Sequence, residues 1–249
     1  MNKKKLFFVV LLVVIIGFVL FLYNAFNGNP ISKYISKEVL EDYLEETYFD
    51  QELQIKEGFY NFKFSEYQYS VIEVGSTDEK GNVKQYEFKV RGFFNPTVSW
   101  DGIYYENLDQ EMANRLSKQA HQEISPLLSE KMDTIHLVEI QLEVLKGKFE
   151  DDVKWSKELA LDKPMEIFVQ LDSTEQTKED FLSAARKVKN ILDEQGYEYE
   201  SVLYNGSGFD MEGLKAETHG YLKYSLRVEK GGVLDMEMLK NIIRKSGSF

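Results

Sequence analysis

Five aromatic residues close together in the sequence are the side chains best suited to recognition. They are Phe93, Phe94, Trp100, Tyr104 and Tyr105. Successive side chains of a strand point to opposite faces, so adjacent aromatics cannot all point inward. The cluster is therefore either a sheet core or a group that includes an exposed recognition patch, because exposed aromatics favour binding sites.

The residues that usually carry catalysis or bind metals form no complete motif. The three histidines, His121, His136 and His219, lack a paired metal-ligand spacing. No glycine-rich phosphate loop has its lysine and hydroxyl, no nucleophile elbow occurs, and cysteine is absent. We therefore expect no enzyme, cofactor or metal site. The 42 acidic residues leave a hydrolase that uses carboxylates as an alternative.

The charge of the chain disfavours nucleic acid as a partner. The formal net charge is −12, and the first thirty residues contribute Lys3, Lys4 and Lys5 but no acid. The remainder is thus even more acidic than the whole, and phosphate backbones would repel it. Only the three lysines favour an anionic membrane face.

An uncharged apolar run near the N-terminus predicts a transmembrane signal anchor. Leu6–Tyr23 is 18 residues long and would span roughly 27 Å as a helix, and extension to Phe26 adds another turn. We expect a cytoplasmic basic tail at 1–5, an anchor at 6–26 and an exported body, because lysines stay on the cytoplasmic side. A cleaved signal peptide is the alternative, but small residues do not lie two apart as its cleavage site requires.

The first part of the body is expected to be one helix followed by antiparallel strands. Pro30 ends the apolar helix, and an amphipathic helix begins near Ile31. Its apolar residues recur at steps of three and four, and they are Ile31, Tyr34, Ile35, Val39, Leu40, Tyr43 and Leu44. The stripe of Ile35, Val39 and Tyr43 is expected to pack onto the first sheet. Three alternating sets predict strands: Tyr60, Phe62, Phe64; Tyr67, Tyr69, Val71; and Tyr86, Phe88, Val90. Asp101–Gly102 predicts a type I′ hairpin, and a second helix runs from Asp109 to about Glu130.

The remaining pattern reads strand, strand, helix, strand, strand, helix. Strands are predicted at 138–144, 165–171, 198–204 and 221–229; one helix opens at Thr177 and Asp180, and a short one runs from 235 to about 244. Helix and strand do not alternate strictly, so a doubly wound sheet is disfavoured. We predict an α+β fold of two small domains, 31–133 and 134–249, with mostly antiparallel sheets and helices on one face of each.

Two stretches of this pattern also resemble a known family. "NGNPISKYISKEVLEDYLEETY" after a basic signal anchor, with "PMEIFVQLDSTEQTKEDFLSAARKVKNILDEQGYEYESV", resembles the YfjL-like membrane proteins of Bacillus-type bacteria. The resemblance implies a Gram-positive cell membrane and this domain order. It brings no catalytic residue with it.

Together these features predict a single-pass cell-membrane protein with a cytoplasmic N-terminus and an extracytoplasmic body. Its expected partners are the lipid bilayer, through the N-terminal helix, and another protein of the cell envelope. The expected role is a binding, regulatory or scaffolding module for that component. A hydrolase and a structural spacer are the alternatives.

Overall fold

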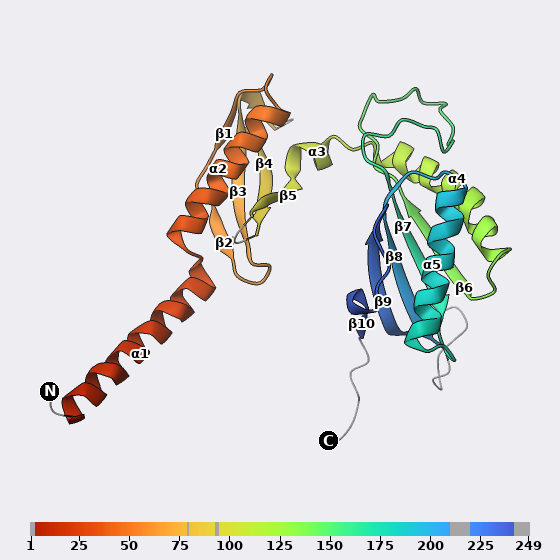
Figure 1. Ribbon diagram of the computed structural model, residues 1–249. Coiled ribbons are helices and arrows are strands. Elements are labelled where there is room, and N and C mark those ends of the chain that lie inside the picture. Colours follow the sequence, from red (N-terminus) through yellow and green to blue (C-terminus); the bar gives the residue numbers. More distant parts are fainter. Residues whose placement is uncertain (1–2, 79, 93–94, 210–219, 242–249) are drawn as a thin grey trace. The chain divides into compact units, whose positions relative to one another are not determined.

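The fold consists of an N-terminal apolar helix followed by two units that each contain a sheet (Figure 1). A computed structural model describes residues 3–78, 80–92, 95–209 and 220–241. The two compact units are Met1–Asn107 and Leu108–Phe249. Helices and strands are combined in each, and the sheets are mostly antiparallel. The predicted α+β class is confirmed.

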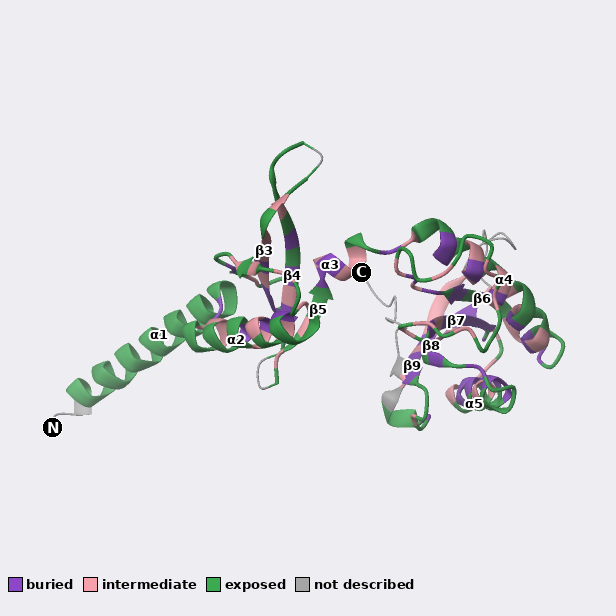
Figure 2. Ribbon diagram, turned by 90° about the horizontal axis from the view of Figure 1, so that it is seen from above, coloured by how far each residue is buried: buried purple, intermediate pink, exposed green. Residues whose placement is uncertain are grey.

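Helix α1 (Lys3–Asn27) carries the apolar run and is exposed along its length (Figure 2). By length and composition it is the one helix of the described chain that could cross a membrane, although a signal sequence near the N-terminus meets the same criterion. Its 25 residues rise roughly 37 Å, more than the ~30 Å of a hydrocarbon core. The helix is therefore compatible with a single-pass membrane anchor.

Helix α2 (Pro30–Thr47) begins directly after α1, and its most buried stripe lies one residue after the predicted stripe of Ile35, Val39 and Tyr43. Its buried residues are Ser36, Leu40 and Leu44, while Val39 and Tyr43 are partly buried and Ile35 is exposed. The reason is Ser36, whose hydroxyl lies 2.6 Å from the Tyr69 phenol oxygen and donates to the Lys33 carbonyl. Apolar periodicity alone does not predict that a serine will be buried.

The sheet of the first unit is antiparallel, with strand order β1-β3-β4-β5 and β2 paired to β3 as well. Its strands are β1 (Leu53–Ile55), β2 (Phe59–Asn61), β3 (Glu66–Thr77), β4 (Val83–Arg91) and β5 (Thr97–Asp101). Two predicted inward sets are confirmed as buried: Tyr67, Tyr69, Val71, Tyr86, Phe88 and Val90. The first set is wrong beyond Tyr60, because the chain turns after Asn61 and leaves Phe62 and Phe64 exposed.

The predicted hairpin at Asp101–Gly102 is also wrong. Asp101 instead caps the short helix α3 (Gly102–Glu106), accepting a hydrogen bond from the Tyr104 N–H at 2.9 Å. Aspartate suits both a turn and a helix N-cap. Here the half-buried Tyr43 and Tyr48 also donate their phenol hydrogens to Asp101, and these distant partners favour the cap.

The second unit is a five-stranded sheet of order β10-β9-β8-β7-β6 that shares one core with two helices. Its elements are α4 (Gln110–Ser129), β6 (Ile135–Gln141), β7 (Met165–Asp172), α5 (Lys178–Glu194), β8 (Tyr199–Gly208), β9 (Tyr221–Glu229), a 3₁₀ helix (Met236–Met238) and β10 (Lys240–Asn241). Only β7 and β8 pair in parallel among these strands, because α5 connects them as a crossover.

Two predicted boundaries differ from the structure. The predicted domain of 31–133 includes α4, but Leu116 and Ile124 of this helix pack in the core of the second unit with Val138. The division therefore falls at Asn107/Leu108 rather than at 133/134. The short helix predicted from 235 to about 244 is a single 3₁₀ turn followed by β10, and positions 242–244 lie outside the described residues.

Candidate functional site

Among the described residues of the first unit, α2 packs on only one face of the sheet, and α3 reaches the edge of the other face through Tyr105. Helix α2 covers the face that carries Tyr69 and Phe88. Side chains at the alternate positions therefore point to the other side of the sheet. We call this side the open face and define it by Phe59, Gln68, Ser70, Gln85, Glu87, Lys89 and Trp100.

A row of directly opposed residues crosses four strands of the open face. Phe59 pairs with Gln68, Gln68 with Lys89, and Lys89 with Trp100. Directly opposed side chains in antiparallel strands share a face and lie close together. The Lys89 ammonium lies 5.1 Å from the Trp100 ring centroid and 3.4 Å from Glu87 Oε1, so a cation–π contact and an ion pair hold it in the row.

The row ends in a stacked pair of aromatic rings. The rings of Trp100 and Tyr105 lie 4.0 Å apart at 13°, and Tyr104 meets Tyr105 edge-on at 5.6 Å. Trp100 is 36% exposed, while Tyr104 and Tyr105 are half-buried. The structure thus brings together three of the five predicted patch residues. Phe93 and Phe94 lie outside the described residues, and the recognition role itself stays a prediction.

A hollow of about 460 Å³ lies on the open face beside this row. Phe59 is 61% exposed there, and the Ser70 hydroxyl is a buried polar atom that makes no hydrogen bond within the described chain. The residues that line this hollow are Glu57, Phe59, Gln68, Tyr69, Ser70, Gln85, Tyr86 and Glu87. Sequence reasoning missed Phe59, Gln68 and Lys89. The alternation of Tyr67, Tyr69 and Val71 already implied that Gln68 and Ser70 face the other way.

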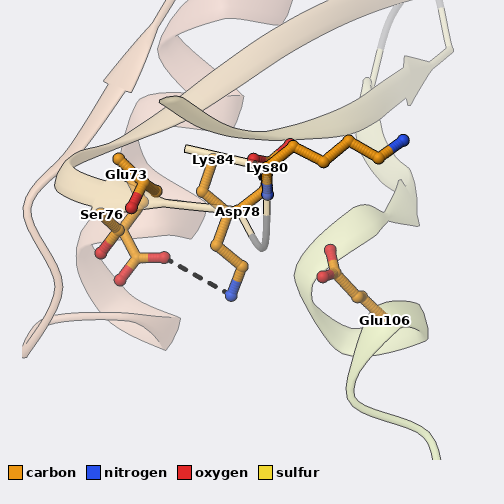
Figure 3. A pocket seen from close by; sticks show the side chains of 7 residues that line it. Glu73, Ser76, Asp78, Lys80, Lys84 and Glu106 are labelled. Atoms are coloured by element: carbon orange, nitrogen blue, oxygen red, sulfur yellow. Dashed lines mark hydrogen bonds and ion pairs between the residues drawn. The ribbon is translucent and has the colours of Figure 1, made fainter. Parts of the chain in front are cut away.

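A second hollow, of about 590 Å³, lies between the β3–β4 hairpin and α3 (Figure 3). Glu73 accepts a hydrogen bond from the Tyr86 phenol at 3.0 Å and lies 3.8 Å from the Lys84 ammonium. The hydrogen bond from Ser76, with those from Tyr86 and Lys84, outweighs burial and holds the pKa of Glu73 below its usual range. Glu106 extends from α3 on the opposite side, and the other lining residues are Thr77, Asp78 and Lys80.

Glu73 and Asp78 in this second hollow are both held in their charged form. Hydrogen bonds from the Asn82 side chain and backbone lower the pKa of Asp78, as those from Ser76 do for Glu73. A general acid needs a carboxyl group that keeps its proton near neutral pH, which requires a raised pKa. Glu73 and Asp78 are therefore suited to hold polar groups or cations rather than to donate protons.

Two of the three histidines, His121 and His136, lie in described parts of the second unit. His121 lies on α4, the His136 ring lies 4.3 Å from the Phe209 ring, and His219 is outside the described residues. Within the described ranges no group of three histidine, aspartate or glutamate side chains could hold a metal ion.

Comparison with known proteins identifies the chain by its two domains. Residues 3–102 match the family "YfjL-like, N-terminal domain", and residues 119–242 match "YfjL-like C-terminal domain". The structural division at Asn107/Leu108 falls between the two matches. The chain belongs to the YfjL-like family, which confirms the resemblance seen in the sequence.

One relative is the protein named "Uncharacterized protein YfjL" of Bacillus subtilis (strain 168). It is 32% identical over 223 residues, which cover 90% of this chain and 92% of the relative. A crystal structure of a DUF5037 family protein from Ruminococcus gnavus ATCC 29149 covers 83% of this chain and 94% of its own. Its identity of 11% and TM-score of 0.24 support no argument about the present chain.

Proposed function

We propose that the protein is a membrane-anchored, extracytoplasmic binding module that regulates or scaffolds another protein of the cell envelope. In this proposal α1 crosses the cell membrane, and Lys3, Lys4 and Lys5 stay on the cytoplasmic side. The open face of the first unit binds the partner. The support for the topology is the uncharged run of α1 and the lysines in front of it.

The stack of Trp100 on Tyr105 is the observation that carries the binding role. Tryptophan and tyrosine offer large, rigid contact areas with few rotatable bonds, and they are enriched among the residues that dominate binding energy. Trp100 remains 36% exposed although it is stacked. The polar side chains of Gln68, Glu87 and Lys89 lie beside it and supply hydrogen-bonding groups around an aromatic centre.

Site-specific photocrosslinking in intact cells tests this role. A photoreactive residue at Gln85, on the open face, should give a discrete protein adduct, and the adduct should be lost when Trp100→Ala is added. The same residue at Glu46, an exposed position on α2, is the matched control and should not give it. Equal adducts from both positions, or an adduct that is indifferent to Trp100→Ala, would contradict the proposal.

The topology has its own test. Protease added outside spheroplasts should digest the body and leave the segment from Lys3 to Tyr23 with the membrane. A body that is protected until the membrane is opened would contradict the orientation.

A further inference from the structure

A turn with two exposed phenylalanines lies outside the open face. It follows β2 and consists of Phe62, Lys63, Phe64 and Ser65, which we call the aromatic turn. Phe62 is 49% exposed and Phe64 is 59% exposed. Two phenylalanines on one short turn are costly in water, so the surface on which they lie needs an explanation.

The aromatic turn lies beside the C-terminal end of α1. The ring of Phe62 meets the ring of Phe26, in the last turn of α1, edge-on with centroids 5.2 Å apart. Strand β2, which leads into the turn, lies next to the break between α1 and α2 in Figure 1. Any surface that the end of α1 reaches is therefore within reach of the turn.

The junction that holds this arrangement is tightly built. Gly28 has φ +72°, and a Cβ atom there would lie 2.5 Å from the Tyr67 phenol oxygen and 2.8 Å from the Tyr60 ring. The Tyr67 hydroxyl also bonds both the N–H and the carbonyl of Asn29. The end of α1 is thus fixed against β2 and β3 rather than joined to them by a loose linker.

We propose that the aromatic turn inserts into the outer interfacial layer of the bilayer that α1 crosses. The proposal rests on the membrane anchor proposed above. If 6–26 spans the hydrocarbon core, Phe26 lies at its outer boundary, and the ring contact places Phe62 at the same depth. A lipid surface is the partner that fits the turn, because the turn continues the exposed apolar surface of α1.

The chemistry of the turn suits such a surface. The Lys63 N–H donates to Asn61 Oδ1 at 3.2 Å, and the Phe64 N–H donates to the Asn61 carbonyl at 3.3 Å. These two donors are satisfied inside the turn, which lowers the cost of moving it out of water. The Lys63 side chain can extend to the phosphate level while its methylenes stay among the acyl chains.

The charge that follows the turn is also compensated. Glu66 is buried and forms an ion pair with Arg91 at 2.7 Å. An unpaired carboxylate there would be repelled by anionic lipid, whereas the pair is not. Lys63 lies between the two phenylalanines in sequence and carries a positive charge, which favours an anionic headgroup layer.

Spin labelling of the full-length protein tests the insertion, and the absence of cysteine makes single-site labelling clean. Lys63→Cys places a nitroxide between the two phenylalanines and leaves both in place. Phe49→Cys is the matched aqueous control, because Phe49 is 84% exposed and follows the other end of α2, which is roughly 27 Å long. Leu12→Cys reports the middle of α1.

The labelled variants are reconstituted into phosphatidylethanolamine–phosphatidylglycerol vesicles, and collision of the nitroxide with oxygen and with a water-soluble nickel chelate is measured. We expect the oxygen preference to be strongest at position 12, intermediate at 63 and absent at 49. Adding Phe64→Ser to Lys63→Cys should shift the label towards the aqueous value, and Phe64 is exposed, so the fold should tolerate the change.

Each outcome decides the proposal. A label at 63 as aqueous as the label at 49, with a label at 12 in lipid, overturns the insertion of the turn but keeps the anchor. An aqueous label at 12 overturns the anchor and the insertion together. An oxygen preference at 63 that Phe64→Ser leaves unchanged also contradicts insertion of the turn through its phenylalanines.

Discussion

The phenol oxygen of Tyr67 bonds both polar groups of the Asn29 backbone. It accepts from the Asn29 N–H at 3.0 Å and donates to the Asn29 carbonyl at 2.9 Å. Asn29 is the N-cap of α2, and its own side chain accepts from the Ile31 N–H at 2.8 Å. One tyrosine of the sheet therefore fixes the residue at which the apolar helix gives way to the folded body.

Tyr67→Phe should destabilise the first unit, because it leaves the Asn29 N–H and carbonyl without this partner. We expect a loss of roughly 1–3 kcal/mol in the free energy of unfolding. Denaturant unfolding of the soluble body from Asn27 to Phe249 measures it. Tyr34→Phe is the control, since the exposed Tyr34 donates only to Glu38 on the same helix, and it should have little effect. Equal effects would mean that the hydrogen bonds between Tyr67 and Asn29 do not contribute to stability.

Gly28→Ala should cost more than an alanine at another glycine with the same backbone conformation. Gly28 (φ +72°) and Gly81 (φ +81°) both lie in the left-handed region, but only Gly28 of the two would place a Cβ within 3 Å of neighbouring atoms. Both substitutions strain the backbone. The difference between them, roughly 1–3 kcal/mol, reports the close approach to Tyr60 and Tyr67. It is measured by unfolding the same soluble body, and equal losses would contradict a tight junction.

The burial of α2 gives a third prediction. Leu40→Ala removes a side chain with 0% exposure and should cost roughly 2–5 kcal/mol through the cavity it leaves. Val39→Ala removes a half-buried side chain and should cost about 1 kcal/mol. Thermal or denaturant unfolding ranks the two. A larger loss at Val39 than at Leu40 would favour the predicted stripe of Ile35, Val39 and Tyr43 instead.

Local sequence patterns predicted the helices and strands of this fold better than they predicted which of these elements pack together. The capping box of Thr177 and Asp180 opens α5 as expected, and Gly196 has φ +74° directly after its C-cap. These features depend on neighbouring residues only. The helix predicted from Asp109 to about Glu130 is confirmed as α4, but its local pattern could not show that it packs with Val138 rather than with the first sheet.

The candidate site was partly predictable for the same reason. An exposed patch was one of the two alternatives for the aromatic cluster, because adjacent aromatics cannot all point inward, and Trp100 is partly exposed. The stack of Trp100 on Tyr105 required α3, and α3 required Asp101 as its cap. That choice depends on Tyr43 and Tyr48, more than fifty residues earlier, which no local pattern contains.

The capping box of α5 predicts a specific loss of stability in acid. The Thr177 side chain and backbone donate to Asp180 and hold its pKa below the ordinary value of 3.8. A group with a lowered pKa in the folded state stabilises the fold above the unfolded value and loses that contribution as pH falls through the folded pKa. The contribution should thus be complete at pH 7 and fade below about pH 3.8.

Asp180→Asn tests this by denaturant midpoints at pH 7 and at pH 2.5. The variant should be less stable than the parent at pH 7, and the gap should shrink in acid, where the parent loses its carboxylate. Glu179→Gln removes an acid from the same helical turn and serves as the charge control. A gap that is the same at both pH values would show that the carboxylate of Asp180 is not the source of the stability.

Asp101 gives the last prediction, because it joins three elements of the first unit. The carboxylate is buried and accepts from the Tyr43 phenol at 2.7 Å, the Tyr48 phenol at 2.6 Å and the Tyr104 N–H at 2.9 Å. Burial, with the hydrogen bond to Asp101, raises the pKa of both Tyr43 and Tyr48, so both phenols stay protonated and able to donate at neutral pH.

Asp101→Ala removes the cap of α3 and the acceptor of both phenols, and it should lower the free energy of unfolding by on the order of 3 kcal/mol. Asp101→Asn keeps a good N-cap and one acceptor oxygen, so it should cost less, about 1 kcal/mol. Unfolding of the soluble body measures both, and tryptophan fluorescence in a Trp155→Phe background reports whether the stack of Trp100 on Tyr105 survives. If Asp101→Ala left both stability and fluorescence unchanged, then α3 and the aromatic stack would not depend on the cap, and the link between α2 and the open face would be wrong.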